Sequence, residues 1–463
     1  MAKQKEIGML LTKGNVTKQL IIFSIPFLLS NIVQSLYNAA DMYMVGQFAS
    51  TASVSGVTIG GQIHMLIVQT VMGLCVGGTI MIAQYKGAEK GKDVNETIST
   101  LLTLLGIASL IVTAVVLALN VPILKLIKTP EESFSEAQYY FNICILGTPF
   151  VFGYNAISGI LRGMGDSKRP LVFVSISCLL NVGLDLLLVK YFAMGAAGAA
   201  IATIVSQAVS LILSWIYLRR SNFSFDMRLR SFKMHKDKVF RIFKLGTPSA
   251  IQSLIVNSSF VIMSALVNFY YGVDASAGVG ISGRINSFAI LPALAIGMSV
   301  SAMVAQNYGA WQLARAKKTM WVGIGISFAF CAVMFTLFQT IPDKLIGFIS
   351  DESPKVVEYG VEYMKACSYD LLVVPFVFCA TNFVNGIGKT TLSMISNMLS
   401  AVILRVPIAI LFSQYMGMGL EGIGYGVPLA TVGTSIILMV YIMSGVWHKK
   451  DKRHLSRAAS GEA

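Results

Sequence analysis

Charged residues are scarce in this chain. Lys, Arg, Asp and Glu make up 13% of its 463 residues, whereas soluble domains carry about 25%. The scarcity leaves long apolar runs without charge, and about 20 such residues cross a bilayer as a helix. The composition therefore excludes an ordinary soluble protein and indicates an integral membrane protein.

Metal-binding and catalytic motifs are also missing. The six cysteines lie in apolar stretches without metal-ligand spacing, so buried free thiols are expected. The chain has no GxSxG, HExxH, CxxC or Walker A motif. The string GIGKTT (386–391) lacks the first P-loop glycine and a preceding strand. We therefore expect no enzyme and no cofactor, and an ion gradient as the energy source.

Apolar runs separated by polar connections predict an all-α polytopic membrane protein with twelve transmembrane helices. The runs lie near residues 20–47, 54–84, 96–118, 138–161, 170–190, 196–218, 245–271, 277–306, 318–341, 357–385, 392–413 and 423–446.

The basic residues predict the orientation. With the N-terminus inside, 28 of the 36 Lys and Arg fall in inner segments, six in outer segments or span ends, and Arg284 and Arg405 within spans. Inner loops of membrane proteins carry the excess of Lys and Arg, so both termini are expected in the cytoplasm and the protein in the cell membrane. The net charge of +14 is then a topology signal, and no nucleic-acid partner is expected.

The two halves of the chain repeat. At a fixed offset of 222 residues, Pro26 falls on Pro248 and Gly56 on Gly278, and the strings AQYKGA and AQNYGA coincide. Six spans is an even number, so both halves start on the same side. This predicts two six-helix lobes related by a pseudo-two-fold axis along the membrane normal, which rock about a central cavity.

The predicted boundaries follow from this repeat. An N-terminal lobe (1–218) is followed by a basic linker (219–244), a C-terminal lobe (245–448) and a cytoplasmic tail (449–463). Part of the linker is able to form an amphipathic helix on anionic headgroups. We expect a monomer.

Acidic residues within spans are few, and because a charge in hydrocarbon is costly they are functional hypotheses. Asp41 and Asp185 both lie in the outer half of the first lobe. Together they can share a proton or hold a monovalent cation. Asn181, four residues before Asp185, faces the same side of the helix and adds an amide oxygen of the kind that suits Na⁺. The alternative is that Asp41 is simply solvated near the outer surface.

Polar residues of the first lobe complete the hypothesis. Asn155 and Thr203 are candidate partners of the ion, and Gln34, Tyr37 and Asn38 are candidate substrate-cavity residues. For each of them an interhelical hydrogen bond is the competing interpretation.

Four further residues remain open. Pro26 is a candidate hinge in the first span, with a static bend as the alternative. His64 is able to titrate, although a packed neutral histidine is the simpler interpretation. Asp370 and Glu362 lie near the outer end of the tenth span, and the sequence assigns them no role.

The chain resembles the multidrug and toxic compound extrusion (MATE) family. The matching strings are PFLLSNIVQSLYNAADMYMVG (26–46), LRGMGDSKRP (161–170), NVGLDLLLV (181–189) and GAAGAAIAT (195–203). The resemblance implies cation-coupled antiport of organic, cationic or amphipathic compounds. Within the family it is similar to the DinF-type branch, which implies an ion site at Asp41, Asn181 and Asp185, with Asn155 and Thr203 as partners.

One departure separates the chain from other branches of that family. Those branches carry an acid on the seventh helix, and the corresponding string PSAIQSLIVNSSF (248–260) has none. The expected function is therefore drug or metabolite export coupled to Na⁺ or H⁺ in the first lobe. The alternative is a flippase for lipid-linked precursors, for which Arg284 and Arg405 are candidate phosphate-binding residues. A membrane enzyme or receptor would need a catalytic constellation or a ligand domain, and neither is present.

Overall fold

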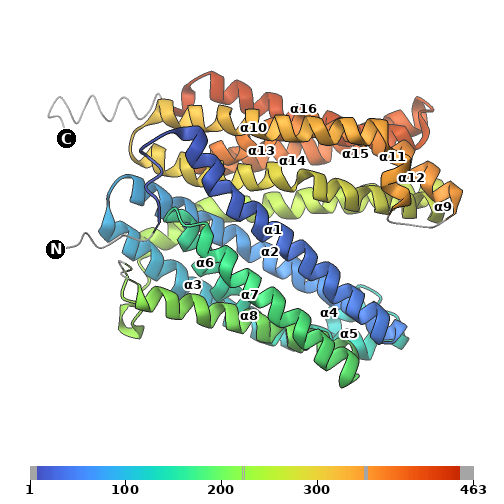
Figure 1. Ribbon diagram of the computed structural model, residues 1–463, viewed down its shortest axis with the longest axis horizontal. Helices are drawn as coiled ribbons and strands as arrows, with labels where there is room; N and C mark the ends of the chain where they lie inside the picture. Colours follow the sequence, from blue (N-terminus) through green and yellow to red (C-terminus); the bar gives the residue numbers. More distant parts are fainter. Residues whose placement is uncertain (1–7, 222, 224, 349–352, 449–463) are drawn as a thin grey trace. The chain divides into compact units, whose positions relative to one another are not determined.

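The computed structural model describes residues 8–221, 223, 225–348 and 353–448, and the regular elements within these ranges are helices (Figure 1). The predicted tail (449–463) lies outside the described residues. The first elements are α1 (Val16–Phe48), α2 (Thr51–Gly87), α3 (Gly91–Ala118), α4 (Asn120–Leu126), α5 (Glu131–Leu146), α6 (Thr148–Gly163), α7 (Lys168–Asp185), the π-helix η1 (Leu186–Tyr191), α8 (Gly195–Arg220) and the 3-10 turn η2 (Leu229–Ser231). They are followed by α9 (Lys236–Gly309), α10 (Leu313–Thr340), α11 (Pro342–Gly347), α12 (Pro354–Ser368), α13 (Asp370–Gly386), α14 (Thr390–Leu399), the π-helix η3 (Ser400–Arg405), α15 (Val406–Ile410), the π-helix η4 (Leu411–Tyr415) and α16 (Gly419–Met443).

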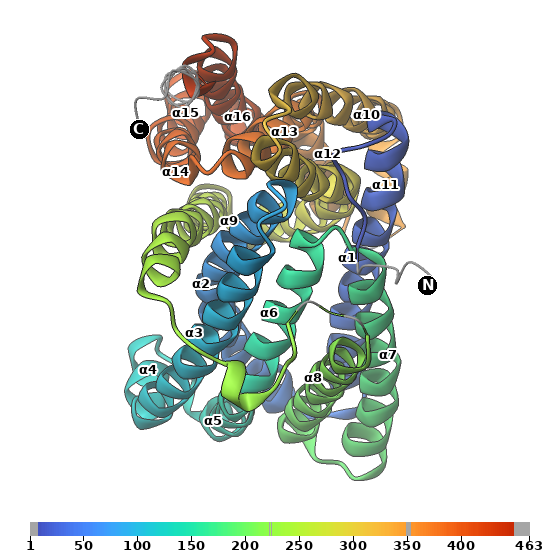
Figure 2. The same cartoon turned by 90° about the vertical axis from the view of Figure 1, so that its left-hand side faces the viewer.

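The chain divides into two compact units. The first runs to Leu254 and includes Ala305–Ala316, and the second contains Ile255–Val304 and the chain from Lys317 onward. In the first unit α1 packs on α7, and α7 packs on α8 (Figure 2). The sequence boundaries at 218 and 245 describe the duplication and stay a prediction, whereas these units describe which helices pack together.

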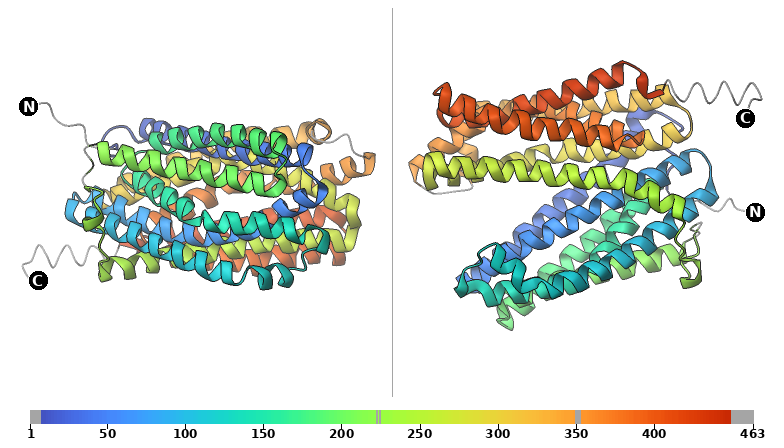
Figure 3. Two further views of the ribbon diagram at one scale, coloured as in Figure 1. Left: turned by 90° about the horizontal axis from the view of Figure 1, so that it is seen from below. Right: turned by 180° about the vertical axis from the view of Figure 1, so that it is seen from behind.

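The predicted spans are confirmed. Nine helices in the described part of the chain are long and apolar enough to cross a membrane, and two bent pairs bring the number to eleven. The helix α9 holds two predicted spans, so twelve result. Its halves, yellow-green to yellow in Figure 3, are separated at Gly272, whose backbone is non-helical with φ 79°. A positive φ of this kind is easily adopted only by glycine.

Two spans are bent, which the apolar runs did not predict. The helices α5 and α6 meet at 47°, and α12 and α13 meet at the same angle. Proline explains the first bend, because Pro149 lies in the first turn of α6 and has no N–H to continue the hydrogen bonding of α5. In the second unit Pro375 lies inside α13, in its second turn. The repeated bend adds to the evidence for duplication.

Wider π-helical turns are repeated as well. The backbone N–H of Phe192 donates to the carbonyl of Leu187 at 3.0 Å, and Met416 donates to Leu411 at 3.0 Å. The first turn follows directly after Asp185, the last residue of α7. Single π-turns inside helices are frequent at functional sites.

Glycines at the repeated positions permit close helix contacts. A Cβ on Gly56 would lie 2.7 Å from the backbone nitrogen of Ala137, and a Cβ on Gly278 would lie 2.5 Å from the carbonyl oxygen of Val356. Within the first unit, a Cβ on Gly87 would lie 1.9 Å from the carbonyl oxygen of Gln306. A Cβ on Gly309 would lie 1.9 Å from the carbonyl oxygen of Gln84. The matching AQYKGA and AQNYGA strings therefore contact each other reciprocally.

Part of the predicted linker (219–244) is helical, because its residues 236–244 are the first residues of α9. Its contact with lipid headgroups stays a prediction. Between α8 and α9 the described residues contain no helix longer than the three-residue turn η2. Hydroxyl groups of α3 pair with the linker backbone instead: Ser99 Oγ accepts from Lys233 N–H at 2.6 Å, and Thr100 Oγ1 accepts from His235 N–H at 3.2 Å. These bonds hold the linker against the first unit.

Candidate ion-binding site

The two predicted acids meet. Asp41 lies on α1 and Asp185 ends α7, and their carboxyl groups are within hydrogen-bonding reach of each other. The Asp185 side chain is fully buried, and Asp41 is partly buried. Two ionised carboxylates only accept hydrogen bonds, so this contact needs a shared proton or an intervening cation.

Asn181 fixes the orientation of Asp185. With its amide oriented to satisfy both ends, Nδ2 donates to Asp185 Oδ2 at 3.0 Å and Oδ1 accepts from the Thr203 N–H at 3.2 Å. Asn181 thus connects α7 to α8 and is fully buried. The expected amide-oxygen ligand is therefore not directed at the acids in this arrangement, because its oxygen is used by the backbone of α8.

Tyr37 and Thr203 extend the cluster. The Tyr37 hydroxyl on α1 donates to Thr203 Oγ1 on α8 at 3.0 Å. Gln34 and Asn38, on the same helix as Tyr37, are exposed and lie outside this hydrogen-bonded cluster. Asn155 is held on its own helix, where its Nδ2 donates to the Val151 carbonyl at 2.8 Å. Their substrate and ion roles stay predictions.

Two residues of α5, Tyr140 and Cys144, interact with Asp41, and the sequence did not single them out. Tyr140 is 7% exposed and interacts electrostatically with Cys144, Asp41 and Tyr37. The two residues lie one turn apart on a bent span. Their spacing was the available signal, but apolar packing explains that spacing equally well.

Two carboxylate oxygens remain open for a ligand. Oδ1 of Asp41 and Oδ1 of Asp185 are buried and have no hydrogen-bond partner. Buried polar atoms usually have hydrogen-bond partners, and a bound ion or water supplies the partner in many of the exceptions. Among the described residues no group of three or more His, Cys, Asp or Glu is arranged to hold a metal ion. A proton or a monovalent cation fits two oxygens better than a transition metal does.

The structure assigns no special role to Pro26 or His64. Pro26 lies inside α1, which continues as one helix through it. His64 on α2 is half-buried, and its Nε2 is buried without a partner in the described structure.

Glu362 has a structural role. Its Oε1 accepts from the backbone N–H of Glu421 in the first turn of α16, at 3.1 Å. The first unit repeats the contact, because Glu136 Oε2 accepts from Ala196 N–H in the first turn of α8 at 3.3 Å. A carboxylate at this position satisfies a free N–H and interacts favourably with the helix dipole.

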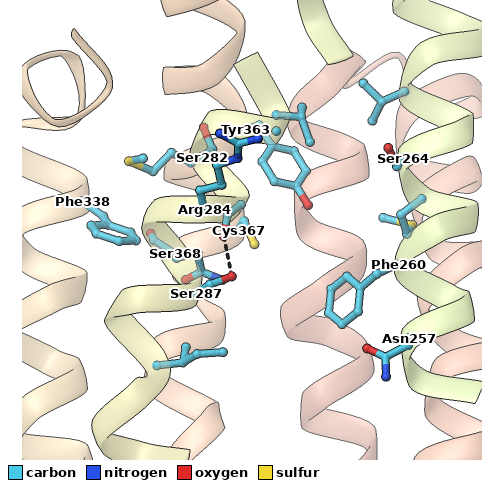
Figure 4. Close-up of a pocket in the computed structure, with 18 residues that line it drawn as sticks. Asn257, Phe260, Ser264, Ser282, Arg284, Ser287, Phe338, Tyr363, Cys367 and Ser368 are labelled. Atoms are coloured by element: carbon cyan, nitrogen blue, oxygen red, sulfur yellow. Dashed lines mark hydrogen bonds between the residues drawn. The ribbon is translucent and has the colours of Figure 1, made fainter. Parts of the chain in front are cut away.

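The second unit has a different electrostatic character. Asp370 is 8% exposed, and its Oδ1 is buried without a hydrogen-bond partner in the described structure. It interacts electrostatically with the buried Arg405 without forming an ion pair. A separate cavity of about 510 Å³ lies beside these helices and is lined by Arg284 (Figure 4).

The fold is that of an integral membrane transporter, and the family that the chain matches consists of secondary transporters, not enzymes. The MatE family model matches residues 26–187 and 248–411, so the chain belongs to the MatE family of MATE transporters. The two matches begin at Pro26 and Pro248, the prolines that the 222-residue offset aligns.

Relatives cover nearly the whole chain. "Probable multidrug resistance protein YpnP" of Bacillus subtilis (strain 168) is 29% identical over 94% of this chain and 97% of its own length. "Probable multidrug resistance protein NorM" of Thermotoga maritima is 25% identical over 94% of each chain. A solved structure described as an outward-facing multidrug resistance MATE family transporter has a TM-score of 0.88 at 22% identity, covering 95% of this chain and 97% of its own. That likeness shows the fold alone.

Proposed function

We propose that this protein exports small organic compounds by cation-coupled antiport, and that the coupling ion binds at Asp41 and Asp185. The contact between the carboxyl groups of the buried Asp185 and the partly buried Asp41 carries the proposal. Multidrug resistance in the names of its relatives supports organic drugs or toxic metabolites as substrates.

Electrostatics explains why the site needs a cation. Two unit charges about 4 Å apart repel by about 4 kcal/mol at an effective dielectric of 20. One proton or one Na⁺ relieves this repulsion. The hydrogen bond from Asn181 holds the Asp185 carboxylate in place. The bound ion would then position the Asp41 carboxylate on α1.

Coupling requires that the ion prefer one conformation. A ligand shifts a conformational equilibrium only by its differential affinity for the two states. Asp41 and Asp185 lie on different helices, so a movement of α1 against α7 would separate the carboxyl groups and release the ion. Pro26 in α1 remains the candidate hinge for this movement.

Several finer assignments belong to the same proposal. We also propose that the protein lies in the cell membrane as a monomer, with both termini in the cytoplasm, and that its substrates are cationic or amphipathic. The DinF-type branch is supported by the acid pair in the first unit and the lack of an acid between 248 and 260.

The test is export from proteoliposomes with Na⁺ and pH gradients imposed separately. Export driven by one gradient in the wild type and lost in Asp41→Asn and Asp185→Asn is expected. Export that continues without either gradient would overturn the coupling proposal.

A flippase for lipid-linked precursors is the second candidate. One observation favours it: Arg284 lines a cavity of the second unit, where a phosphate would find a cationic partner. Movement of a fluorescent organic cation against its gradient by purified protein would favour export over this candidate.

A further inference from the structure

The cavity in the second unit is built by three helices. Both halves of α9 line it, together with Phe338 of α10 and a face of α12 that includes Tyr363 and Cys367 (Figure 4). The chain folds back at Gly272, so residues on either side of that break face the same space. The volume of about 510 Å³ falls in the range of about 300–1,000 Å³ that small-molecule sites occupy.

The lining combines apolar surface with a cation. Phe260, Met263 and Phe338 supply aromatic and aliphatic contacts, while Asn257, Ser264 and Asn286 are polar. Arg284 is the only charged side chain among the lining residues, and it forms no ion pair with an acid in the described part of the chain. The cavity therefore offers a positive charge and no carboxylate.

A second arginine lies behind the wall. Arg405 is 7% exposed, its guanidinium carbon lies 4.3 Å from the ring centroid of Phe260, and it donates to Ser259 Oγ at 2.6 Å. Asp370 is the acid whose charge acts on Arg405. Arg284, by contrast, lines the cavity and has no acidic ion-pair partner among the described residues.

We propose that this cavity binds the anionic group of an amphipathic organic compound, with Arg284 as the contact to a carboxylate, sulfonate or phosphate. The fixed fork of a guanidinium matches these groups through two parallel hydrogen bonds. The aromatic wall accommodates the apolar part. The inference rests on the export function proposed above and narrows its substrates to anions and zwitterions, and a zwitterion would also satisfy the cationic expectation.

A matched pair of probes tests the charge preference. Dansylglycine carries a carboxylate and dansylcadaverine an ammonium group on the same fluorophore. Binding of each to the purified full-length protein in phosphatidylcholine nanodiscs is measured by fluorescence. The wild type is expected to bind dansylglycine at least about tenfold more tightly, which is the scale of one charge-assisted hydrogen bond.

Three variants assign the preference. Arg284→Gln is expected to lose it, and Arg284→Lys is expected to keep part of it because it retains the charge. Lys355→Gln removes an exposed cation of the same unit that does not line the cavity, and it is expected to keep the full preference. Equal binding of both probes by the wild type would overturn the proposal, as would a preference that survives in Arg284→Gln.

Two further binding experiments distinguish a failure of this proposal from a failure of the export proposal, and they show whether the anion is a lipid or a free compound. Asp41→Asn is expected to retain the dansylglycine preference while losing export, so either proposal can fail alone. If a lipid headgroup occupies the cavity, phosphatidylglycerol in the nanodiscs competes with dansylglycine and weakens its measured binding. Unchanged binding in them assigns the site to a free compound.

Discussion

Asp185→Asn is the sharpest perturbation of the candidate ion site. The substitution removes one negative charge and preserves the shape of a fully buried side chain. Its amide oxygen can still accept from Asn181, whose Nδ2 lies 3.0 Å from Asp185 Oδ2. Folding should therefore be maintained, with a change in unfolding free energy below about 1 kcal/mol, since the lost charge had no basic partner to stabilise it.

The effect on the ion is much larger. A hydrogen bond or ion contact to a charged group contributes about 1.5–3 kcal/mol, which corresponds to roughly 10- to 150-fold in affinity. At ion concentrations below saturation, gradient-driven export should fall by at least about tenfold. Asp41→Asn should have a similar effect, because each carboxyl group supplies one of the two open oxygens.

The assay is export of a fluorescent organic substrate from proteoliposomes across a series of Na⁺ concentrations and pH values. Thermal unfolding and gel filtration verify that each variant is folded. Asp343→Asn, an exposed carboxylate on α11, is the matched control and should export as the wild type does. Wild-type ion dependence in Asp185→Asn would refute the assignment of the ion to this pair.

Three further outcomes are expected. Tyr37→Phe removes the 3.0 Å bond to Thr203, so the ion concentration for half-maximal export should rise by about fivefold, the equivalent of about 1 kcal/mol; an unchanged value would separate Tyr37 from the site. Gly87→Ala places a Cβ 1.9 Å from a carbonyl oxygen and should destabilise the protein by about 1–3 kcal/mol, whereas Gly106→Ala, with open space around it, should not lower the melting temperature. Lys238→Met breaks the contact with Asp93 and should cost about 1–2 kcal/mol, compared with less than about 0.5 kcal/mol for Lys92→Met at an exposed pair.

The acid pair was predictable because charge in an apolar span is costly and rare. Asp41 and Asp185 stand out from their surroundings, and Asn181 follows from helical spacing. The direction of the Asn181 amide was not predictable. It depends on the backbone N–H of Thr203, on another helix, which the sequence does not place beside Asn181.

The sequence did not predict the helix bends or the cavity, for a related reason. An apolar run records that a segment is buried in lipid or protein but not its direction, so the 47° breaks at Gly147 and Tyr369 left no trace in hydropathy. Arg284 was visible as an isolated cation. Its place in a cavity depends on the reversal at Gly272, which brings distant parts of α9 to one space.

The separation of charge between the units has a thermodynamic consequence for antiport. The acid pair belongs to the first unit and Arg284 to the second. If both proposals hold, ion and substrate do not compete for the same atoms. Their opposition must then be a coupling free energy between two sites. Such coupling is reciprocal. If the bound ion lowers the affinity for the substrate by some factor, the bound substrate lowers the affinity for the ion by the same factor. Direct competition at one site would instead show each ligand fully excluding the other at saturation, so binding titrations in both directions distinguish the two mechanisms.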